Sequence, residues 1–257
     1  MKHHEYYKLG IGTFVRDLCD EFGKIGKIVD AIGSVDDCLE NLKDKNAKIT
    51  SFLSLIFDSL DFNGCQTKRI NDLFTVSIGK TPPRKEQEWF NPLTNGVPWL
   101  SIKDFGKNEA FISSTEETLT ADAVRKFKIP VYSANTLLMS FKLTLGKVGF
   151  TAKPMCTNEA IAAFLPSQET EKYIPFLFCY LRTLNLSKCG NTSSIANAIN
   201  SGIIRNLSLP IMGDEALDAF NHKAIPLLKI LAINSKKIAS LQAIKTRLLS
   251  KYFGSIS

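Results

Sequence analysis

The sequence is short of the residues on which most catalytic and metal sites depend. It has only three histidines, at positions 3, 4 and 222, and its six cysteines are scattered with no Cys-x-x-Cys pair. No zinc-ligand spacing can be assembled from these residues, and no Ser-His-Asp arrangement is credible. Scattered, unpaired thiols are typical of a reducing compartment, so we expect a cytoplasmic protein with free cysteines.

Several sequence signatures are absent as well. No apolar run reaches the roughly 18 residues of a membrane span, and the first residues lack the apolar core of a secretory signal. The methyltransferase signature Asn/Asp-Pro-Pro-Tyr/Phe does not occur, nor does an acidic residue followed two places on by lysine, as in many nucleases. Gly79-Lys80-Thr81 looks like the end of a P-loop, but Phe74 stands where the first glycine belongs. We therefore expect no membrane segment and no catalysis by this chain alone.

Two segments with a similar apolar pattern bracket the middle of the chain. At one constant offset, Ile32 corresponds to Leu228 and Phe57 to Phe253, and both segments carry apolar residues at three- and four-residue steps. This spacing predicts two long amphipathic helices, each of which must bury one face against a partner. We expect them to pair as an antiparallel coiled coil, either within one chain or between two. A plain helical hairpin in the core explains the apolar pattern but not the domain between its arms.

The first helix is predicted over residues 28–64, after a separate short helix over 13–22 and a break at Gly23 and Gly26. The second helix is predicted from Ala224 to Phe253, with Pro226 in its first turn.

The middle of the chain is predicted to be a mixed domain of short strands and helices. Residues 137–141 and 147–150 are predicted to form a hairpin, residues 160–165 a buried strand, residues 173–184 a helix and residues 203–210 a closing strand. The fold class is therefore α+β. The predicted organisation is an unplaced segment 1–27, a first helix 28–64, a central domain 65–213 and a second helix over 214–257.

Charge differs between these parts. The formal net charge is −3 for residues 1–66, +6 for residues 67–213 and +4 for residues 214–257. A basic middle beside an acidic front favours a module that binds a polyanion on a protein-binding support, although a surplus of this size is also common in proteins that bind no nucleic acid.

Blocks within residues 67–257 follow an order known from one family. The blocks are Ile78-Gly79-Lys80-Thr81-Pro82-Pro83, Gly96-Val97-Pro98-Trp99-Leu100-Ser101-Ile102-Lys103-Asp104-Phe105, residues 136–148, Thr157-Asn158-Glu159-Ala160 and Leu207-Ser208-Leu209-Pro210-Ile211. They resemble the target recognition domain of the specificity (S) subunits of type I restriction–modification systems. The resemblance implies a subunit that reads double-stranded DNA, performs no chemistry itself, and recruits modification subunits that methylate adenine and restriction subunits that translocate and cleave. S-adenosylmethionine, ATP and Mg²⁺ would then belong to the partner subunits, and this chain would hold no cofactor.

The sequence departs from the family pattern in one respect. S subunits usually carry two recognition domains, and this chain has one between two spacer-like helices. It therefore resembles a half-S chain, or the second half of a full-length S subunit with about 25 unrelated residues in front. We therefore expect a homodimer, formed through the helices, that reads a bipartite site with inverted halves. Two other hypotheses remain at this stage: a recognition fragment of a fused single-chain restriction–methylation enzyme, and a silent S cassette.

If the middle domain reads DNA, lysine and arginine should contact phosphates and amide or hydroxyl side chains should contact base edges. The predicted contacts are Lys80, Thr81, Arg84, Lys85, Lys142, Lys147, Lys188, Asn191, Thr192, Ser193, Asn197 and Arg205. The alternative is that they are ordinary surface residues. Trp89, Trp99 and Phe105 are predicted to be core residues rather than stacking platforms, and the pairs Lys103-Asp104 and Asn158-Glu159 to make structural hydrogen bonds.

Overall fold

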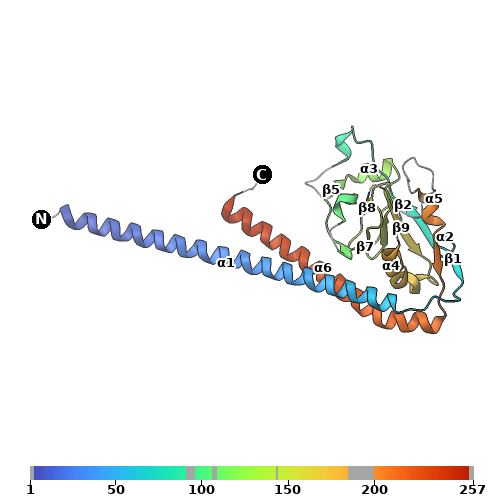
Figure 1. The fold of residues 1–257 in the computed structure, drawn as a ribbon. Helices are drawn as coiled ribbons and strands as arrows, with labels where there is room; N and C mark the ends of the chain where they lie inside the picture. The colour runs from blue at the N-terminus through green and yellow to red at the C-terminus, as the bar shows by residue number, and fades with distance from the viewer. Residues whose placement is uncertain (1–2, 91–95, 106–108, 143, 185–199, 255–257) are drawn as a thin grey trace, which may run out of the picture. The chain divides into compact units, whose positions relative to one another are not determined.

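A computed structural model describes residues 3–90, 96–105, 109–142, 144–184 and 200–254; within α1 and α6, the side chains of residues 3–22, 24 and 253 are not described. The chain divides into two compact units, and each is described by itself. The helical unit comprises residues 1–44 and 238–257, and the sheet unit comprises residues 45–237. Helices α1 (His3–Asp58) and α6 (Asp214–Phe253) contribute residues to both (Figure 1).

The first helix is longer than the sequence indicated. It begins at His3, so the predicted break at Gly23 and Gly26 is wrong, as is the separate short helix over 13–22. A glycine in a helix costs only about 1 kcal/mol relative to alanine, which the many hydrogen bonds of a long helix can absorb. The helix ends at Asp58, and Gly64 adopts a left-handed φ of 76° in the turn that follows.

The two long helices pair within the chain. In the sheet unit, Asn46 accepts a hydrogen bond from the Asn234 side-chain amide at 2.7 Å, and Phe57 lies 6.4 Å from Phe220 between ring centroids. Because the contacts advance along α1 while they recede along α6, the pairing is antiparallel, as predicted. In the helical unit, the Lys245 ammonium donates to both carboxylate oxygens of Asp36, at 2.6 and 2.7 Å.

Helix α6 begins at Asp214, three turns before Ala224, where the apolar pattern was expected to start. Pro226 therefore lies inside the helix rather than in its first turn, which corrects the prediction. Proline leaves the carbonyl one turn earlier without its helical donor. That carbonyl belongs to His222, an exposed residue, so water can satisfy it.

The sheet unit is built on a five-stranded sheet in the order β2-β9-β6-β7-β4. Its strands are β2 (Phe74–Ile78), β4 (Phe111–Ile112), β6 (Leu137–Ser140), β7 (Val148–Thr151) and β9 (Ile161–Pro166). The predicted hairpin is confirmed as the antiparallel pair β6 and β7. The predicted buried strand is also confirmed, since β9 lies between β2 and β6 and its residues 161–164 are buried.

Smaller elements complete the sheet unit. A three-stranded sheet has the order β5-β3-β8, and β1 pairs with β10. The bounds are β1 (Thr67–Arg69), α2 (Ile70–Leu73), η1 (Gln87–Trp89), β3 (Val97–Leu100), η2 (Ile102–Asp104), β5 (Glu117–Leu119), α3 (Ala121–Lys126), β8 (Cys156–Thr157), η3 (Glu171–Tyr173), α4 (Ile174–Thr183), α5 (Ser201–Arg205) and β10 (Ser208–Pro210). The predicted helix over 173–184 is confirmed as α4.

The predicted closing strand over 203–210 is correct only for β10. Its first part is the short helix α5, because the Asn200 side chain caps that helix by accepting hydrogen bonds from the backbone amides of Gly202 and Ile203, at 2.9 and 3.1 Å.

One aromatic cluster joins the ends of the long helices to the sheet. Phe57 of α1 lies 5.3 Å from Phe176 of α4 between ring centroids, and Phe176 lies 5.9 Å from Phe220 of α6. These rings belong to a core that continues through Phe150 and Phe164 of the sheet. The α+β fold with flanking long helices is thus confirmed, and Leu53 and Phe57 near the end of α1 are part of the sheet unit's core. Among the described residues, no helix is both long and apolar enough to cross a membrane.

Candidate nucleic-acid interface

The segment after β2 is held by the turn that joins β8 to β9. The Gly79 amide donates to the Ile161 carbonyl at 3.2 Å, and the Lys80 amide donates to the Thr157 carbonyl at 2.9 Å. A β-carbon on Gly79 would lie 2.2 Å from the backbone oxygen of Thr157, so no larger residue fits there without displacing the backbone. The Thr81 hydroxyl donates to the Glu159 carboxylate. The predicted contact residues Lys80 and Thr81 are therefore anchored at their backbone or side chain.

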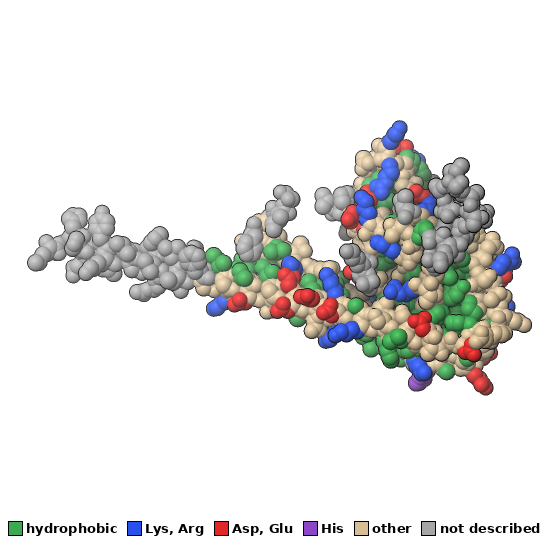
Figure 2. Space-filling model, viewed as in Figure 1, with side chains coloured by type: hydrophobic (Ala, Val, Ile, Leu, Met, Phe, Trp, Pro, Cys, Tyr) green, Lys and Arg blue, Asp and Glu red, His purple; other side chains and the backbone are tan. Residues whose placement is uncertain are grey.

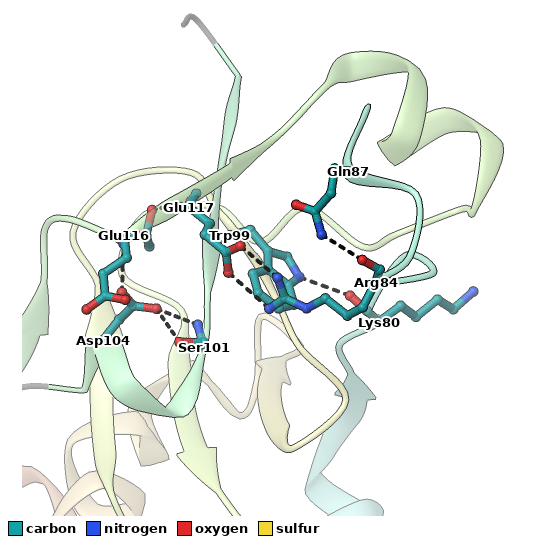
Figure 3. Close-up of polar contacts among 9 residues, drawn as sticks. Lys80, Arg84, Gln87, Trp99, Ser101, Asp104, Glu116 and Glu117 are labelled. Carbon is teal, nitrogen blue, oxygen red and sulfur yellow. Dashed lines mark hydrogen bonds and ion pairs between the residues drawn. The ribbon is translucent and has the colours of Figure 1, made fainter. Parts of the chain in front are cut away.

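Arg84 connects this segment to strand β5. Its guanidinium donates to both carboxylate oxygens of Glu117, at 2.6 and 3.0 Å, and lies 4.4 and 4.5 Å from the ring centroids of Phe90 and Trp99 (Figure 3). A bidentate pair and two aromatic rings fix the orientation of this side chain. Arg84 was predicted to contact phosphate; in this structure its charge is matched by a carboxylate, and its contacts hold the loop to the sheet.

Further hydrogen bonds hold the backbone of the same loop. The Trp99 indole N–H donates to the Lys80 carbonyl at 3.0 Å, and the Gln87 side-chain amide donates to the Arg84 carbonyl at 2.7 Å (Figure 3). Trp99 is 1% exposed and Phe105 is 4% exposed, which confirms the prediction that both are core residues. Trp89 is partly exposed and packs edge-to-face against Phe127.

Asp104, Asn158 and Glu159 of the two polar pairs make structural hydrogen bonds, as predicted. The Asp104 carboxylate accepts hydrogen bonds from the amide and hydroxyl of Ser101, each at 2.7 Å, and from the Glu116 amide at 2.8 Å. The Asn158 side-chain oxygen accepts from the Ala160 amide at 3.1 Å. These bonds shape the loops next to β3 and β9, and Figure 3 shows those of Asp104.

A basic cluster forms where α3 meets the loop after β2. The Lys80 ammonium lies 3.4 Å from the Phe127 carbonyl oxygen, and the Lys126 ammonium lies 4.3 Å from the centroid of the Trp89 ring. Lys128 is the residue after Phe127 and has a left-handed φ of 49°. We call Lys80, Lys126 and Lys128 the basic cluster; all three side chains are exposed, and no carboxylate among the described residues pairs with them. In Figure 2, lysine and arginine side chains are spread over this part of the sheet unit.

Two members of the basic cluster, Lys126 and Lys128, were not among the predicted contacts. The alternation of basic and apolar residues in Arg125-Lys126-Phe127-Lys128 was a possible signal. It did not suffice, because the proximity of this segment to Lys80 depends on the fold.

The other predicted contact residues are dispersed. The Lys147 ammonium donates to the Phe105 carbonyl at 2.8 Å, Lys142 lies over the Phe141 ring, and Arg205 donates to the Val76 carbonyl at 3.4 Å. Lys85 is exposed and has no partner among the described residues. The predicted contacts Lys188, Asn191, Thr192, Ser193 and Asn197 lie outside the described residues.

Comparison with known proteins identifies the central part of the chain. Residues 63–216, more than half of the sequence, match the family model described as the type I restriction modification DNA specificity domain. The chain is 24% identical over 194 residues to the type I restriction enzyme HindI specificity subunit of Haemophilus influenzae, covering 73% of this chain and 40% of that protein. It is 27% identical over 113 residues to the MjaIX specificity subunit of Methanocaldococcus jannaschii, covering 43% of this chain and 26% of that protein.

Solved structures share the fold. The S subunit of a type I system from M. genitalium aligns with a TM-score of 0.58 and 18% identity, over 87% of this chain and 59% of that chain. The HsdS subunit of Thermoanaerobacter tengcongensis aligns with a TM-score of 0.51 and 18% identity, over 90% of this chain and 57% of that chain. This chain therefore spans less than two thirds of the length of the proteins it matches.

Proposed function

This chain belongs to the type I restriction–modification DNA specificity family, and we propose that it is a sequence-specific DNA-recognition subunit with no catalytic activity of its own. The observation that carries the proposal is the family match over residues 63–216, the part of the chain that contains the basic cluster. The three exposed ammonium groups of the basic cluster, which pair with no carboxylate in the part of the chain that the structure describes, can neutralise phosphates. Residues 67–213 also carry a net charge of +6, which favours association with a polyanion.

The proposed partners are double-stranded DNA, a modification subunit and a restriction subunit. In this proposal the modification subunit methylates adenine with S-adenosylmethionine, and ATP and Mg²⁺ serve the restriction subunit, all in the cytoplasm. This chain would position those activities by binding one DNA sequence. The two relatives from Haemophilus influenzae and Methanocaldococcus jannaschii are specificity subunits, which supports this role over a recognition fragment of a fused enzyme or a silent cassette.

We further propose that two chains assemble so that two recognition domains read a bipartite site. Because α1 and α6 pair within each chain, the second chain would contact side chains that this pairing leaves exposed, such as Phe52, Ile230 and Ile233. An isologous dimer presents two identical readers in opposite directions, which predicts inverted half-sites. A strict monomer in sedimentation velocity at high micromolar concentration, with modification subunit present, would contradict the dimer.

The DNA-binding proposal is tested by replacing the basic cluster. We expect the triple variant Lys80→Gln, Lys126→Gln, Lys128→Gln, in complex with the modification subunit, to bind duplex DNA more weakly for every sequence tested. Loss of three phosphate contacts should also lower the slope of log K against log salt by about 3, since each contact contributes about 0.9. Fluorescence anisotropy of labelled duplexes at several salt concentrations measures both quantities.

The matched control replaces three exposed lysines of α6, Lys223, Lys229 and Lys237, by glutamine, which removes the same charge elsewhere in the sheet unit. Equal loss of affinity and slope in both triple variants would show that net charge, and not the basic cluster, governs binding.

A further inference from the structure

A small polar pocket lies between α1 and α4 in the sheet unit. It has a volume of about 120 Å³ and is lined by Ala47, Thr50, Ser51, Ser54 and Arg182. Four of these residues come from the end of α1, and Arg182 comes from the last turn of α4, which lies beside α1 in Figure 1. A pocket of this size can hold one small polar group rather than a cofactor.

The Arg182 guanidinium has no acceptor in this pocket. It makes no ion pair or hydrogen bond with any described residue, and its contact is the face of Phe178, 5.4 Å from the ring centroid. Burial lowers the pKa of Arg182 from its ordinary value. Arginine has five N–H donors, and placing them in a half-buried site without an acceptor is unfavourable. An external acceptor would remove this cost.

The hydroxyl groups of the pocket do not supply that acceptor, and two of them are already committed as donors. The Thr50 hydroxyl donates to the Asn46 carbonyl at 2.8 Å, and the Ser54 hydroxyl donates to the Thr50 carbonyl at 3.3 Å. The Ser51 hydroxyl has no partner among the described residues. The pocket can thus offer a ligand one guanidinium and one free hydroxyl.

Neither wall of the pocket contains a carboxylate in its sequence. No aspartate or glutamate occurs between Asp44 and Asp58 on the α1 side, and none occurs between Glu171 and Asp214 around α4. The 42 residues that follow Glu171 before Asp214, including those outside the description, therefore cannot neutralise Arg182. A carboxylate that neutralises Arg182 would therefore have to come from outside these two segments.

We propose that the pocket is a binding site for a single carboxylate, an aspartate or glutamate side chain presented by a partner protein. A planar carboxylate matches the guanidinium fork by two parallel hydrogen bonds, and one carboxylate balances the one charge. DNA is less suited to this pocket, because a phosphate backbone is bound by several cations along a groove and Arg182 is the only cation among the described residues that line this pocket. This site is separate from the basic cluster and does not depend on the proposed DNA recognition.

The experiment uses the full-length chain without DNA, with acetate as the probe. Acetate replaces chloride at constant ionic strength, and the Nε–H signal of Arg182 is followed by NMR on ¹⁵N-labelled protein. We expect a saturable shift with a Kd on the order of 10–100 mM, as one charge-assisted bidentate contact would give. The shift should be absent in Arg182→Met, and Arg125→Met, which removes an exposed arginine, should leave the Arg182 response intact.

A second variant places the carboxylate inside the chain. Ala47→Glu should occupy the pocket, abolish the acetate response and raise Tm by about 2–4 °C relative to Ala47→Gln, because it supplies the missing partner. In the Arg182→Met background the two Ala47 variants should have the same Tm.

Three results would overturn the proposal: a linear, non-saturating acetate response; an unchanged acetate response in Ala47→Glu; or saturable binding of inorganic phosphate without binding of acetate. The last result would assign the pocket to a phosphate instead of a carboxylate.

Discussion

At the scale of single residues, close packing around the loop after β2 determines which side chains are tolerated. Gly79 passes so close to the backbone of Thr157 and Asn158 that a β-carbon would overlap their carbonyl oxygens. The clash is with backbone, which cannot rotate away as a flexible side chain can. The close approach at Gly79 fixes the backbone position of the next two residues, Lys80 and Thr81.

We expect Gly79→Ala to lower the free energy of unfolding by about 3 kcal/mol or more, because β2 and the β8–β9 turn must separate to admit the methyl group. Chemical denaturation monitored by tryptophan fluorescence measures the change. The control is Gly33→Ala, whose β-carbon meets open space on α1 and should stabilise the helix by about 0.5–1 kcal/mol. Equal effects of the two substitutions would contradict the close approach at Gly79.

Two buried thiols predict how stability changes in alkali. Burial raises the pKa of Cys156 and of Cys179 to about 12, from an ordinary value of 9.0. Between about pH 9 and 12 the unfolded chain loses these protons and the folded chain keeps them. The unfolded state then binds fewer protons, so the free energy of unfolding falls as pH rises, by about 1.4 kcal/mol per pH unit for each thiol.

We therefore expect Cys156→Ala to show a shallower decline between pH 9 and 11 than the parent protein in urea denaturation. Cys38→Ala, which removes an exposed thiol, is the control and should decline as the parent does. Parallel declines in all three proteins would contradict the assignment of Cys156 as a buried, protonated thiol.

At the scale of elements, the end of α1 belongs to the core of the sheet unit, which the helical pattern alone did not reveal. Leu53 is 1% exposed, whereas Leu55, two residues further along the same helix, is 65% exposed. The difference reflects the face of α1 that meets α4 and α6. Residues 45–58 of α1 thus stabilise the domain that carries the basic cluster.

We expect Leu53→Ala to lower the free energy of unfolding by about 2–5 kcal/mol, because it leaves a cavity in the core. The matched variant Leu55→Ala removes the same atoms from the surface and should change it by less than about 0.5 kcal/mol. Both are measured by denaturation at low protein concentration, which keeps association from contributing. A small effect of Leu53→Ala would mean that α1 does not pack on the sheet.

Elements with a strong local signal could be predicted, and those set by tertiary contacts could not. The β6–β7 hairpin and the buried strand β9 follow from short apolar runs with turn residues between them. The length of α1 was underestimated, because local glycine penalties were given more weight than the continuity of a long helix. The apolar residues of the short helix α5 predict a strand. The capping hydrogen bonds of Asn200, which favour the helix, cannot be recognised from the sequence alone.

The residues that make up the candidate site could be named from the sequence only in part. The sequence named Lys80, in the loop after β2, among the phosphate contacts, and the base contacts were predicted in residues 191–197, which lie outside the described residues. Lys126 and Lys128 join Lys80 through the position of Phe127, a contact between residues far apart in sequence. Arg84 was predicted to contact phosphate, and its partner Glu117, also distant in sequence, could not be anticipated.

At the scale of the whole molecule, the chain combines one recognition domain with two helices that pair within the same chain. The solved S subunits that share its fold are longer, and this chain covers less than two thirds of them. In our proposal a bipartite site is read by two recognition domains, and the second domain is supplied by another chain. The geometry of the two-chain assembly would determine the spacing and the orientation of the two half-sites.

The most direct test of the central claim, that this chain reads a DNA sequence for partner subunits, is a map of methylated bases in cells that express it with its modification subunit. Cells with the modification subunit alone are the control. We predict N⁶-methyladenine in one gapped motif with inverted halves, present only when this chain is expressed. A stable complex that leaves no methylated motif, or a motif that persists without this chain, would contradict the claim.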